Sequence, residues 1–361
     1  MDIKLFEKIL KTPSISGKEL YIQKLLIEEL KDVDDEIITH HSYNTVHVLN
    51  KDAKVKVLLA AHIDEIGLII TDILPNGICK VSNVGAIRPE MYVGQRVNVV
   101  KFQNNAYQYI PGVISYQAKA DNSKPETSDL ILDLGTLTKE ETLNLVSIGD
   151  VVIHPDNVTY LENNLISSRA LDDKIATFIC CEVLKRLKNQ TKNGVYFAST
   201  VGEETTGRGS VFTTSMINPT LAIILDVGSS SDVQYYHVSN RNVSLGHGPM
   251  FTVASNGNEI LTDLLKKTAI KNNIPYQEVV EYSKTYTDFD TIYKQNGGIP
   301  STLISIPLRY MHSSVEVGSL TDVEYIIQLS LGHSTRLRKV QACTEKTQSF
   351  PTQRHYALIC G

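Results

Sequence analysis

Two adjacent carboxylates follow a short apolar run near the middle of the chain. Residues 195–201 are rich in β-branched and aromatic side chains, a pattern typical of a buried strand, and Gly202, Glu203 and Glu204 come directly after them. Consecutive side chains at the end of a strand point to opposite sides. One carboxylate can therefore hold a cation while its neighbour holds a water molecule beside it. The alternative is a solvated turn, which is the common explanation of an isolated Glu-Glu pair.

Other candidate ligands occupy comparable places in the sequence. His62 and Asp64 follow the apolar run 55–61, and side chains two residues apart in an extended chain share a face. In an open α/β sheet, functional sites form at the carboxyl ends of the strands, so residues just past apolar runs are expected to meet there. The remaining candidates, which lie just past an apolar run or at the start of a helix, are Asp172, Asp226 and His312.

Two imidazoles and several carboxylates form a ligand set suited to divalent zinc, cobalt or manganese. A pair of such ions needs one bridging carboxylate, and the two ions would lie roughly 3.5–4 Å apart. Each residue alone also has a structural explanation. Asp172 can cap the helix after it, Asp226 can belong to a turn, and His312 can be a buried core histidine. Taken together, the residues favour a metal centre.

Composition limits the classes of function. The chain has 361 residues, 42% hydrophobic and 21% charged, which predicts a globular protein with two domains or one domain carrying a large insertion. A net charge of -5 without a basic run argues against a nucleic-acid partner. The sequence lacks the apolar core of a signal peptide and any apolar stretch long enough to span a membrane. Five cysteines without metal-knuckle spacing are typical of a reducing compartment, so we expect a cytoplasmic protein.

The order of elements predicts an α/β fold with an insertion. In residues 1–66 and 155–332, strand-like runs alternate with helical ones, which indicates a mainly parallel mixed sheet flanked by helices. Residues 67–154 consist of short β-rich pieces separated by Gly, Pro and Asn, the pattern of a small β-barrel or sandwich. This segment holds no cluster of catalytic residue types, so we interpret it as a non-catalytic inserted domain. Residues 333–361 are polar and aperiodic, and we expect them to be poorly ordered.

The motifs around the candidate ligands resemble those of metallopeptidase family 42, which contains the glutamyl and tetrahedral (TET) aminopeptidases with co-catalytic metals. They occur in the family's order across residues 5–332, so the resemblance covers nearly the whole chain. It implies a zinc-aminopeptidase-like domain interrupted by a β-rich dimerisation domain, with dimers assembling into a homo-oligomeric dodecamer. The motifs are Ala61-His62-Ile63-Asp64-Glu65-Ile66-Gly67, Ala170-Leu171-Asp172-Asp173-Lys174, Gly202-Glu203-Glu204, Leu225-Asp226 and Pro307-Leu308-Arg309-Tyr310-Met311-His312-Ser313.

The resemblance also implies a role for each candidate residue. Glu203 would be the general base that holds the attacking water, and Asp64 would orient His62. Two divalent ions per subunit are implied, zinc first, with cobalt or manganese as alternatives. Their ligands would be His62 and Asp226 for one ion, Glu204 and His312 for the other, and Asp172 as the bridge.

Two segments depart from the family pattern. After the Glu pair, the family has apolar-Gly-apolar-Arg-Gly, whereas this chain has Thr205-Thr206-Gly207-Arg208-Gly209. Where relatives often carry Gly-Gly-Thr-Asp-Ala, this chain has Thr285-Tyr286-Thr287-Asp288-Phe289. That second loop lines the substrate pocket in relatives, so the resemblance leaves the preferred N-terminal residue open.

The function expected is a metal-dependent aminopeptidase that removes N-terminal residues from short peptides. One alternative is a glycoside hydrolase of the endoglucanase kind, which would use two carboxylates, need neither His62 nor His312, and keep its activity in chelator. Another is a non-catalytic oligomeric binding protein whose metals only stabilise the fold. The extra carboxylate of Glu203, which no structural metal site requires, argues against this second alternative.

Overall fold

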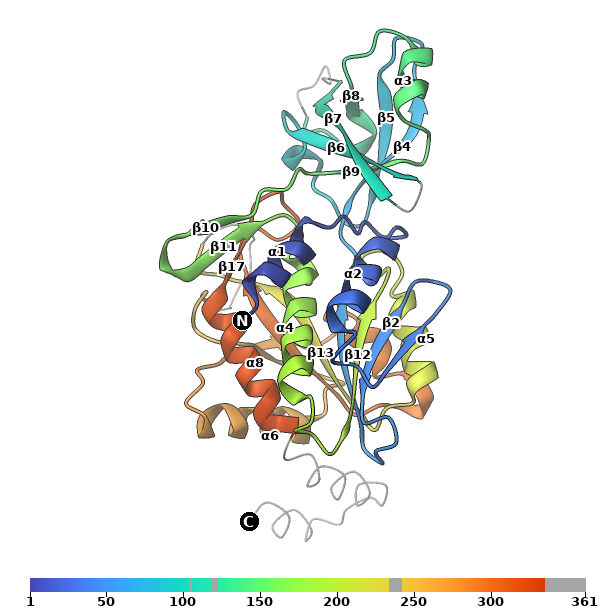
Figure 1. Cartoon of the computed structure of the whole chain (residues 1–361). Helices are drawn as coiled ribbons and strands as arrows, with labels where there is room; N and C mark the ends of the chain where they lie inside the picture. The colour runs from blue at the N-terminus through green and yellow to red at the C-terminus, as the bar shows by residue number, and fades with distance from the viewer. Residues whose placement is uncertain (104–105, 118–122, 234–241, 335–361) are drawn as a thin grey trace.

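The computed structural model describes residues 1–103, 106–117, 123–233 and 242–334. It consists of a larger α/β body with a small β-barrel that stands on one end of it (Figure 1). The poorly ordered tail expected at residues 333–361 lies, from residue 335 onward, outside the described residues. Within the described part of the chain, every helix is too short or too polar to cross a membrane.

An eight-stranded mixed sheet forms the centre of the larger body, which confirms the expected fold class. Its central strands run parallel, in the order β12 (Gly194–Thr200), β3 (Lys56–His62), β13 (Leu221–Ser229) and β16 (Ser301–Leu308). The sheet is extended at both sides by antiparallel pairs, except that β15 runs parallel to β14. Beyond β12 lie β2 (Thr45–Leu49) and β1 (Glu36–Thr39), and beyond β16 lie β14 (Met250–Ala254) and β15 (Gln277–Glu281).

Helices cover both faces of this sheet because side chains alternate along its buried strands. In β3, Val57 and Leu59 enter one apolar cluster, whereas Leu58 and Ala60 enter the cluster on the opposite face. Figure 1 shows α1, α4 and α8 in front of the sheet. The first face is covered by α1 (Ile3–Lys11), α2 (Leu20–Leu30), α4 (Leu171–Leu187), α6 (Glu259–Lys271) and α8 (Leu320–Ser334), and the second by α5 (Arg208–Ile217) and α7 (Phe289–Ile292).

The smaller body is a closed barrel with its own apolar core. A short helix, α3 (Lys139–Leu145), lies against it, and the Thr138 hydroxyl accepts the Glu141 N–H at 3.2 Å as an N-terminal cap. The barrel strands in order of pairing are β4 (Gly67–Ile73), β5 (Cys79–Val84), β8 (Leu130–Asp133), β7 (Ala106–Tyr116), β6 (Arg96–Gln103) and β9 (Val151–Ile153).

The remaining elements are a small second sheet and short 3-10 helices. A three-stranded sheet contains β10 (Thr159–Leu161), β11 (Leu165–Ser168) and β17 (Glu316–Ser319), which brings the segment before α4 next to the segment before α8. The 3-10 helices are η1 (Pro89–Met91), η2 (Thr127–Asp129), η3 (Glu162–Asn164) and η4 (Gln295–Gly297).

A buried ionic cluster ties the chain after β3 to the start of α4. The carboxylate of Glu65 accepts hydrogen bonds from Lys174 Nζ at 2.8 Å and from the guanidinium of Arg169. It also accepts the Ser14 N–H at 2.8 Å. All three charged side chains are buried. Burial alone would raise the pKa of Glu65, but the two cations outweigh it and lower this pKa to about 2.

We predict that Glu65→Gln lowers the free energy of unfolding by about 3–5 kcal/mol, because it removes the buried counter-charge of Lys174 and one of the two carboxylates that pair with Arg169. Denaturant unfolding at neutral pH measures the change. In the wild type, the contribution of Glu65 is present above its ordinary pKa of 4.5 and is lost as the pH falls toward 2.

Glu278→Gln is the matched control, since Glu278 is exposed and pairs with Lys266 at 2.7 Å on the surface. Its effect is expected to stay within about 0.5 kcal/mol. Equal effects of the two substitutions would contradict the importance of the buried cluster.

Candidate active site

The candidate ligands gather at the carboxyl ends of the parallel strands. His62 is the last residue of β3, and its register partner on β12 is Thr200, so Glu203 and Glu204 leave the neighbouring strand at the same edge of the sheet. Asp226 lies in β13 on the other side of β3, and His312 follows β16. Since these four strands are parallel, their ends bring the side chains together.

Asp172, at the start of α4, lies between the two imidazoles. Its Oδ1 is 3.1 Å from Nε2 of His62, and its Oδ2 is 3.3 Å from Nε2 of His312. Nδ1 of His62 donates to the backbone carbonyl of Asp64 at 3.1 Å, and Nδ1 of His312 donates to the carbonyl of Ala86 at 2.9 Å. Because these two hydrogen bonds occupy Nδ1 of each ring, both Nε2 atoms face the carboxylate of Asp172.

This arrangement fits a pair of divalent cations. A neutral imidazole whose Nδ1 carries the hydrogen presents a lone pair at Nε2, and a lone pair that faces a carboxylate oxygen is repelled unless a proton or a metal ion lies between them. The described residues offer two groups of ligand atoms that lie within 4.8 Å of one another. These groups are His62, Asp173 and Asp226, and His62, Asp172 and Glu204. His312 is outside both groups, although its Nε2 is 3.6 Å from Glu204 Oε1.

The shifted pKa values of the clustered side chains also favour bound cations. Burial, and then the charge of Asp172, raises the pKa of Glu204 to about 8. Burial likewise raises the pKa values of Glu203 and Asp226, with neighbouring carboxylates adding to the effect. Burial would lower the pKa of His312, but Asp172 and Glu204 outweigh it and raise that pKa to about 10. Negative charge is thus in excess here, and divalent cations would neutralise it.

Asp64 holds the loop that carries the two glutamates. Its carboxylate accepts the N–H of Glu203 at 3.0 Å, the N–H of Glu204 at 3.3 Å and the hydroxyl of Ser16. The same carboxylate lies 3.6 Å from Nδ1 of His62, farther than the carbonyl of Asp64 itself. Asp64 therefore supports His62 mainly through its backbone and fixes the Glu pair through its side chain.

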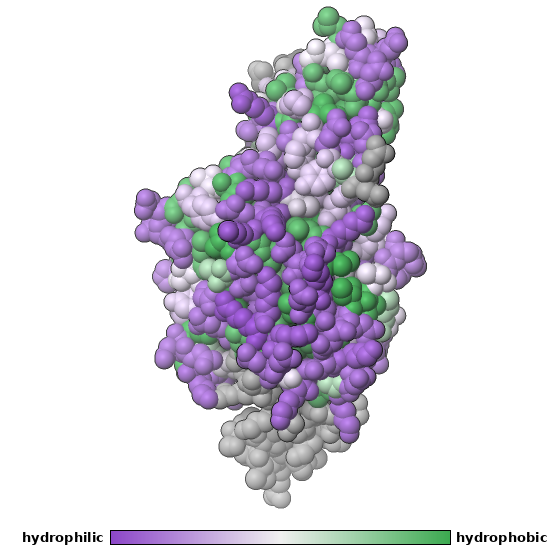
Figure 2. All heavy atoms as spheres, viewed as in Figure 1, coloured by the Kyte–Doolittle hydropathy of each residue, from purple (hydrophilic) through white to green (hydrophobic). Residues whose placement is uncertain are grey.

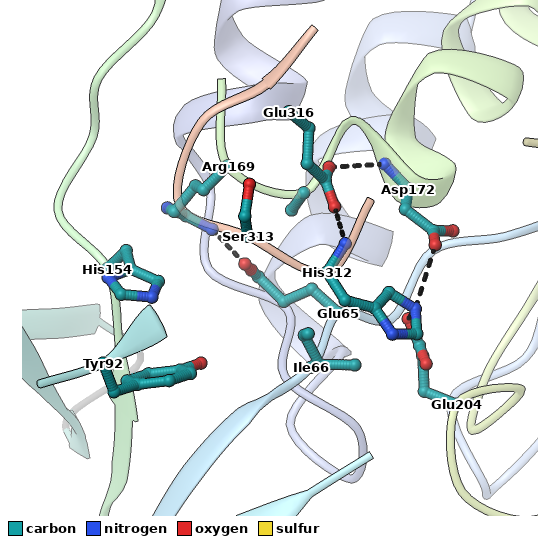
Figure 3. A pocket seen from close by; sticks show the side chains of 11 residues that line it. Glu65, Ile66, Tyr92, His154, Arg169, Asp172, Glu204, His312, Ser313 and Glu316 are labelled. Atoms are coloured by element: carbon teal, nitrogen blue, oxygen red, sulfur yellow. Dashed lines mark hydrogen bonds and ion pairs between the residues drawn. The ribbon is translucent and has the colours of Figure 1, made fainter. Parts of the chain in front are cut away.

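Two residues that the sequence analysis left without a role belong to this cluster. Glu316, at the start of β17, accepts the N–H of His312 at 2.8 Å and the N–H of Asp172 at 3.1 Å, as Figure 3 shows. Asp173 is buried, and both of its carboxylate oxygens lack a hydrogen-bond partner. Such orphaned oxygens are expected where a cation belongs. Glu316 therefore fixes two candidate ligands through their backbones, and Asp173 is an additional candidate ligand.

A side chain at the turn before the Glu pair would have to displace Arg208. Gly202 has a φ of +66°, and a Cβ at this position would overlap the guanidinium of Arg208. Nη2 of Arg208 lies 3.6 Å from Oε1 of the buried Glu19. Arg208 therefore lies between this turn and Glu19.

Comparison with known families agrees with this geometry. The profile of the M42 glutamyl aminopeptidase family matches residues 44–329. The chain belongs to this family. It is therefore a hydrolase of the aminopeptidase type, and the resemblance noted from its motifs is confirmed.

Members of the M42 family with similar sequences or structures span almost the whole chain. The lysyl aminopeptidase of Pyrococcus furiosus is 30% identical over 91% of this chain and 96% of its own length. The TET aminopeptidase of the marine sediment archaeon Thaumarchaeota archaeon SCGC AB-539-E09 superposes with a TM-score of 0.87 at 26% identity, covering 93% of this chain and 96% of that one. The TET1 peptidase of Pyrococcus horikoshii can assemble into a tetrahedron or a large octahedral shell. It superposes with a TM-score of 0.81 at 28% identity, covering 93% of this chain and 99% of that one.

We predict that Gly202→Ala reduces kcat/KM on the order of 100-fold, because the added methyl group displaces Arg208 and shifts the adjacent Glu pair. Gly94→Ala is the matched control. Gly94 also has a positive φ, +75°, but a Cβ there meets nothing within 4 Å. Both variants should lose similar thermal stability from the unfavourable φ. Equal activity of the two variants would contradict the proposed restraint on the turn.

Proposed function

We propose that this M42 member is a metal-dependent aminopeptidase that uses two divalent ions to remove N-terminal residues from short peptides. The observation that carries the proposal is the position of Asp172, whose two carboxylate oxygens face two different imidazoles. A carboxylate in this position is suited to bridge two cations. Zinc is the first candidate because imidazole and carboxylate ligands suit it, and cobalt and manganese are alternatives.

The proposed ligand set keeps the roles suggested by the motifs, with Asp173 as an additional candidate. Nε2 of His62 lies 4.0 Å from Oδ1 of Asp226, and these two residues would hold one ion. His312 and Glu204 would hold the other. When bound, the ions would polarise the scissile carbonyl and lower the pKa of the attacking water.

Glu203 is the residue in place to move the proton. It lines the pocket beside the candidate ligands, and the hydrogen bond from its N–H to Asp64 fixes its backbone. Its carboxylate would accept a proton from the attacking water and return it to the leaving amine. Asp64 would act by positioning, because it restrains both glutamates and contributes the carbonyl that sets the tautomer of His62.

The two alternative functions fit the site less well. A glycoside hydrolase needs a pair of carboxylates, and this centre also directs two imidazole nitrogens at one carboxylate. A binding protein with structural metals would have no use for Glu203 beside a complete ligand set. Measuring hydrolysis of aminoacyl chromogenic substrates by the apo-enzyme, with zinc, cobalt and manganese added back, separates all three functions.

We predict that exhaustive chelation abolishes hydrolysis of aminoacyl substrates and that adding a divalent ion restores it. The physical reason is that water at neutral pH is a weak nucleophile without a cation to acidify it. Full activity in a preparation shown to be free of metal would overturn the proposal. Retained hydrolysis of a β-glucan under the same conditions would favour the glycoside hydrolase instead.

Substitutions of Glu203 and Glu204 should impair the enzyme in different ways. Glu203→Gln removes the proton acceptor but no ligand, so turnover should fall by about 10²–10⁴ while two ions per subunit remain. Glu204→Gln removes an anionic ligand, so one ion should bind more weakly and excess metal should partly rescue activity. Metal content per subunit, measured beside turnover, distinguishes the variants. Loss of an ion from Glu203→Gln but not from Glu204→Gln would reverse the two roles.

We further propose that the barrel, which we place at residues 67–154 as a separate domain, carries the contacts between subunits of a homo-oligomer, a dimer that builds a dodecamer. Figure 2 shows hydrophobic side chains over the barrel, on the side where Figure 1 places α3. Leu137 and Ile148, which flank α3, are 79% and 57% exposed. Apolar side chains gathered in this way are typical of protein contacts.

Replacing Leu137 and Ile148 together by Glu should lower the molar mass measured by light scattering, because charges then face the partner subunit. Ile270→Glu is the control, since Ile270 is 64% exposed on α6, far along the chain from the barrel. An unchanged mass of the double variant would refute this role for the barrel.

A further inference from the structure

A cavity of about 600 Å³ opens beside the candidate metal centre. His62, Asp172, Glu203, Asp226 and His312 line one end of it. The rest of the lining includes side chains from β13, β14, β15 and β16, both apolar ones and polar ones such as Thr252 and Ser305. The apolar side chains include Val227, Met250, Val279 and Leu303. A substrate residue whose backbone reaches the metal centre would therefore place its side chain against a lining that includes these apolar side chains.

Tyr286 stands at this cavity in an unfavourable backbone conformation. Its φ is +55°, which bulky L-residues rarely adopt. The loop is fixed all the same, because Asp290 accepts the N–H of Tyr286 at 3.0 Å and the N–H of Thr285 at 3.1 Å. The hydroxyl of Thr287 accepts the Phe289 N–H at 3.1 Å and shares a hydrogen bond with Thr285.

Contacts of the Tyr286 side chain within the protein do not offset the energetic cost of this backbone conformation. The side chain of Tyr286 lines the cavity and is 81% exposed, so most of the ring lacks contacts with the described protein. Strained residues persist where the surroundings hold them, and they gather at sites that bind ligands. An aromatic side chain on a fixed backbone at the rim of this cavity has only two rotatable bonds, so it loses little conformational entropy when a substrate covers it.

We propose that Tyr286 is a specificity-determining residue that covers the side chain of the substrate's N-terminal residue and selects large apolar residues such as Leu, Met and Phe. The inference rests on the proposed aminopeptidase function and names its substrate class. Binding encloses the apolar side chain between the tyrosine ring and the wall formed by Met250, Val279 and Leu303. The same contact forms before and during the reaction, so it acts on KM rather than on kcat.

Tyr286→Gly separates this role from a structural one, because glycine relieves the backbone conformation while removing the ring. The thermal midpoint should rise, whereas KM for Leu and Phe aminoacyl fluorogenic substrates should increase about tenfold, with kcat within about twofold. The Ala substrate, whose methyl group does not reach the ring, should change by less than about twofold. Tyr286→Phe should match the wild type, and Tyr286→Asn provides a second ring deletion compatible with positive φ.

Tyr282→Gly is the matched control, since Tyr282 is also exposed, at 74%, but does not line the cavity. It should leave the ratio of Leu to Ala hydrolysis unchanged. Equal losses for Ala and Leu in Tyr286→Gly, or an unchanged KM for Leu, would overturn the inference. So would a preference of the wild type for Lys substrates that Glu281→Gln abolishes, because Glu281 also lines the cavity.

The outcomes also separate this inference from the proposed function. A metal-loaded wild type that hydrolyses no aminoacyl substrate overturns the aminopeptidase function and the inference with it. An active wild type whose selectivity is the same with and without the ring of Tyr286 overturns the inference alone.

Discussion

Repulsion between buried carboxylates is the constraint on which the arrangement of the catalytic edge depends. Glu203, Glu204 and Asp226 each have a raised pKa because burial removes water from the charged form and like charges lie nearby. Side chains would move apart if they were free to do so. They stay together because they leave parallel strands whose spacing the sheet sets, and because Asp64 and Glu316 hold the backbone N–H groups around them. This repulsion would be relieved by bound cations, which is why it supports the proposed metal centre.

Buried ion pairs also connect the segments that carry the candidate ligands. Glu65 and Arg169 lie three residues from His62 and Asp172, respectively, so their ion pair joins the segments that carry these two residues. Lys174 adds a second positive charge at this junction, and Asp156 pairs with Arg169 as a second carboxylate. The ionic cluster therefore contributes to the stability of the junction.

The sequence was sufficient to predict the parts of this site that follow regular patterns. Residues placed just past apolar runs, such as His62 and Glu203, were predicted because parallel strands bring such positions to one edge. Glu316 was missed because it follows no apolar run, and its role depends on β17 lying beside the start of α4. Asp173 was given no role because only the structure shows that its carboxylate oxygens are buried and unpaired.

Features that depend on contacts between distant segments also could not be predicted from the sequence. The strand β14 (Met250–Ala254) is short, and it pairs with β16 out of chain order. The helix α7 is also short and covers only Phe289–Ile292. Asn296 then has a φ of 51°, which ends helical backbone geometry. Pairing order and left-handed residues are decided by tertiary contacts, which leave little periodic signal in a single sequence.

The hydrogen bond from His312 to the Ala86 carbonyl has an evolutionary consequence. One peptide group of the segment between β5 and η1 sets the tautomer of an imidazole in the other body. Every amino acid carries the same carbonyl, so natural selection at this point acts on the path of the main chain and hardly on residue identity. Ala86 can therefore be replaced, provided that the length and curvature of the loop persist, whereas Gly85 before it has a φ of +76° that side chains rarely adopt. In this chain, an insertion or deletion before η1 is more damaging to the lineage than a replacement of Ala86.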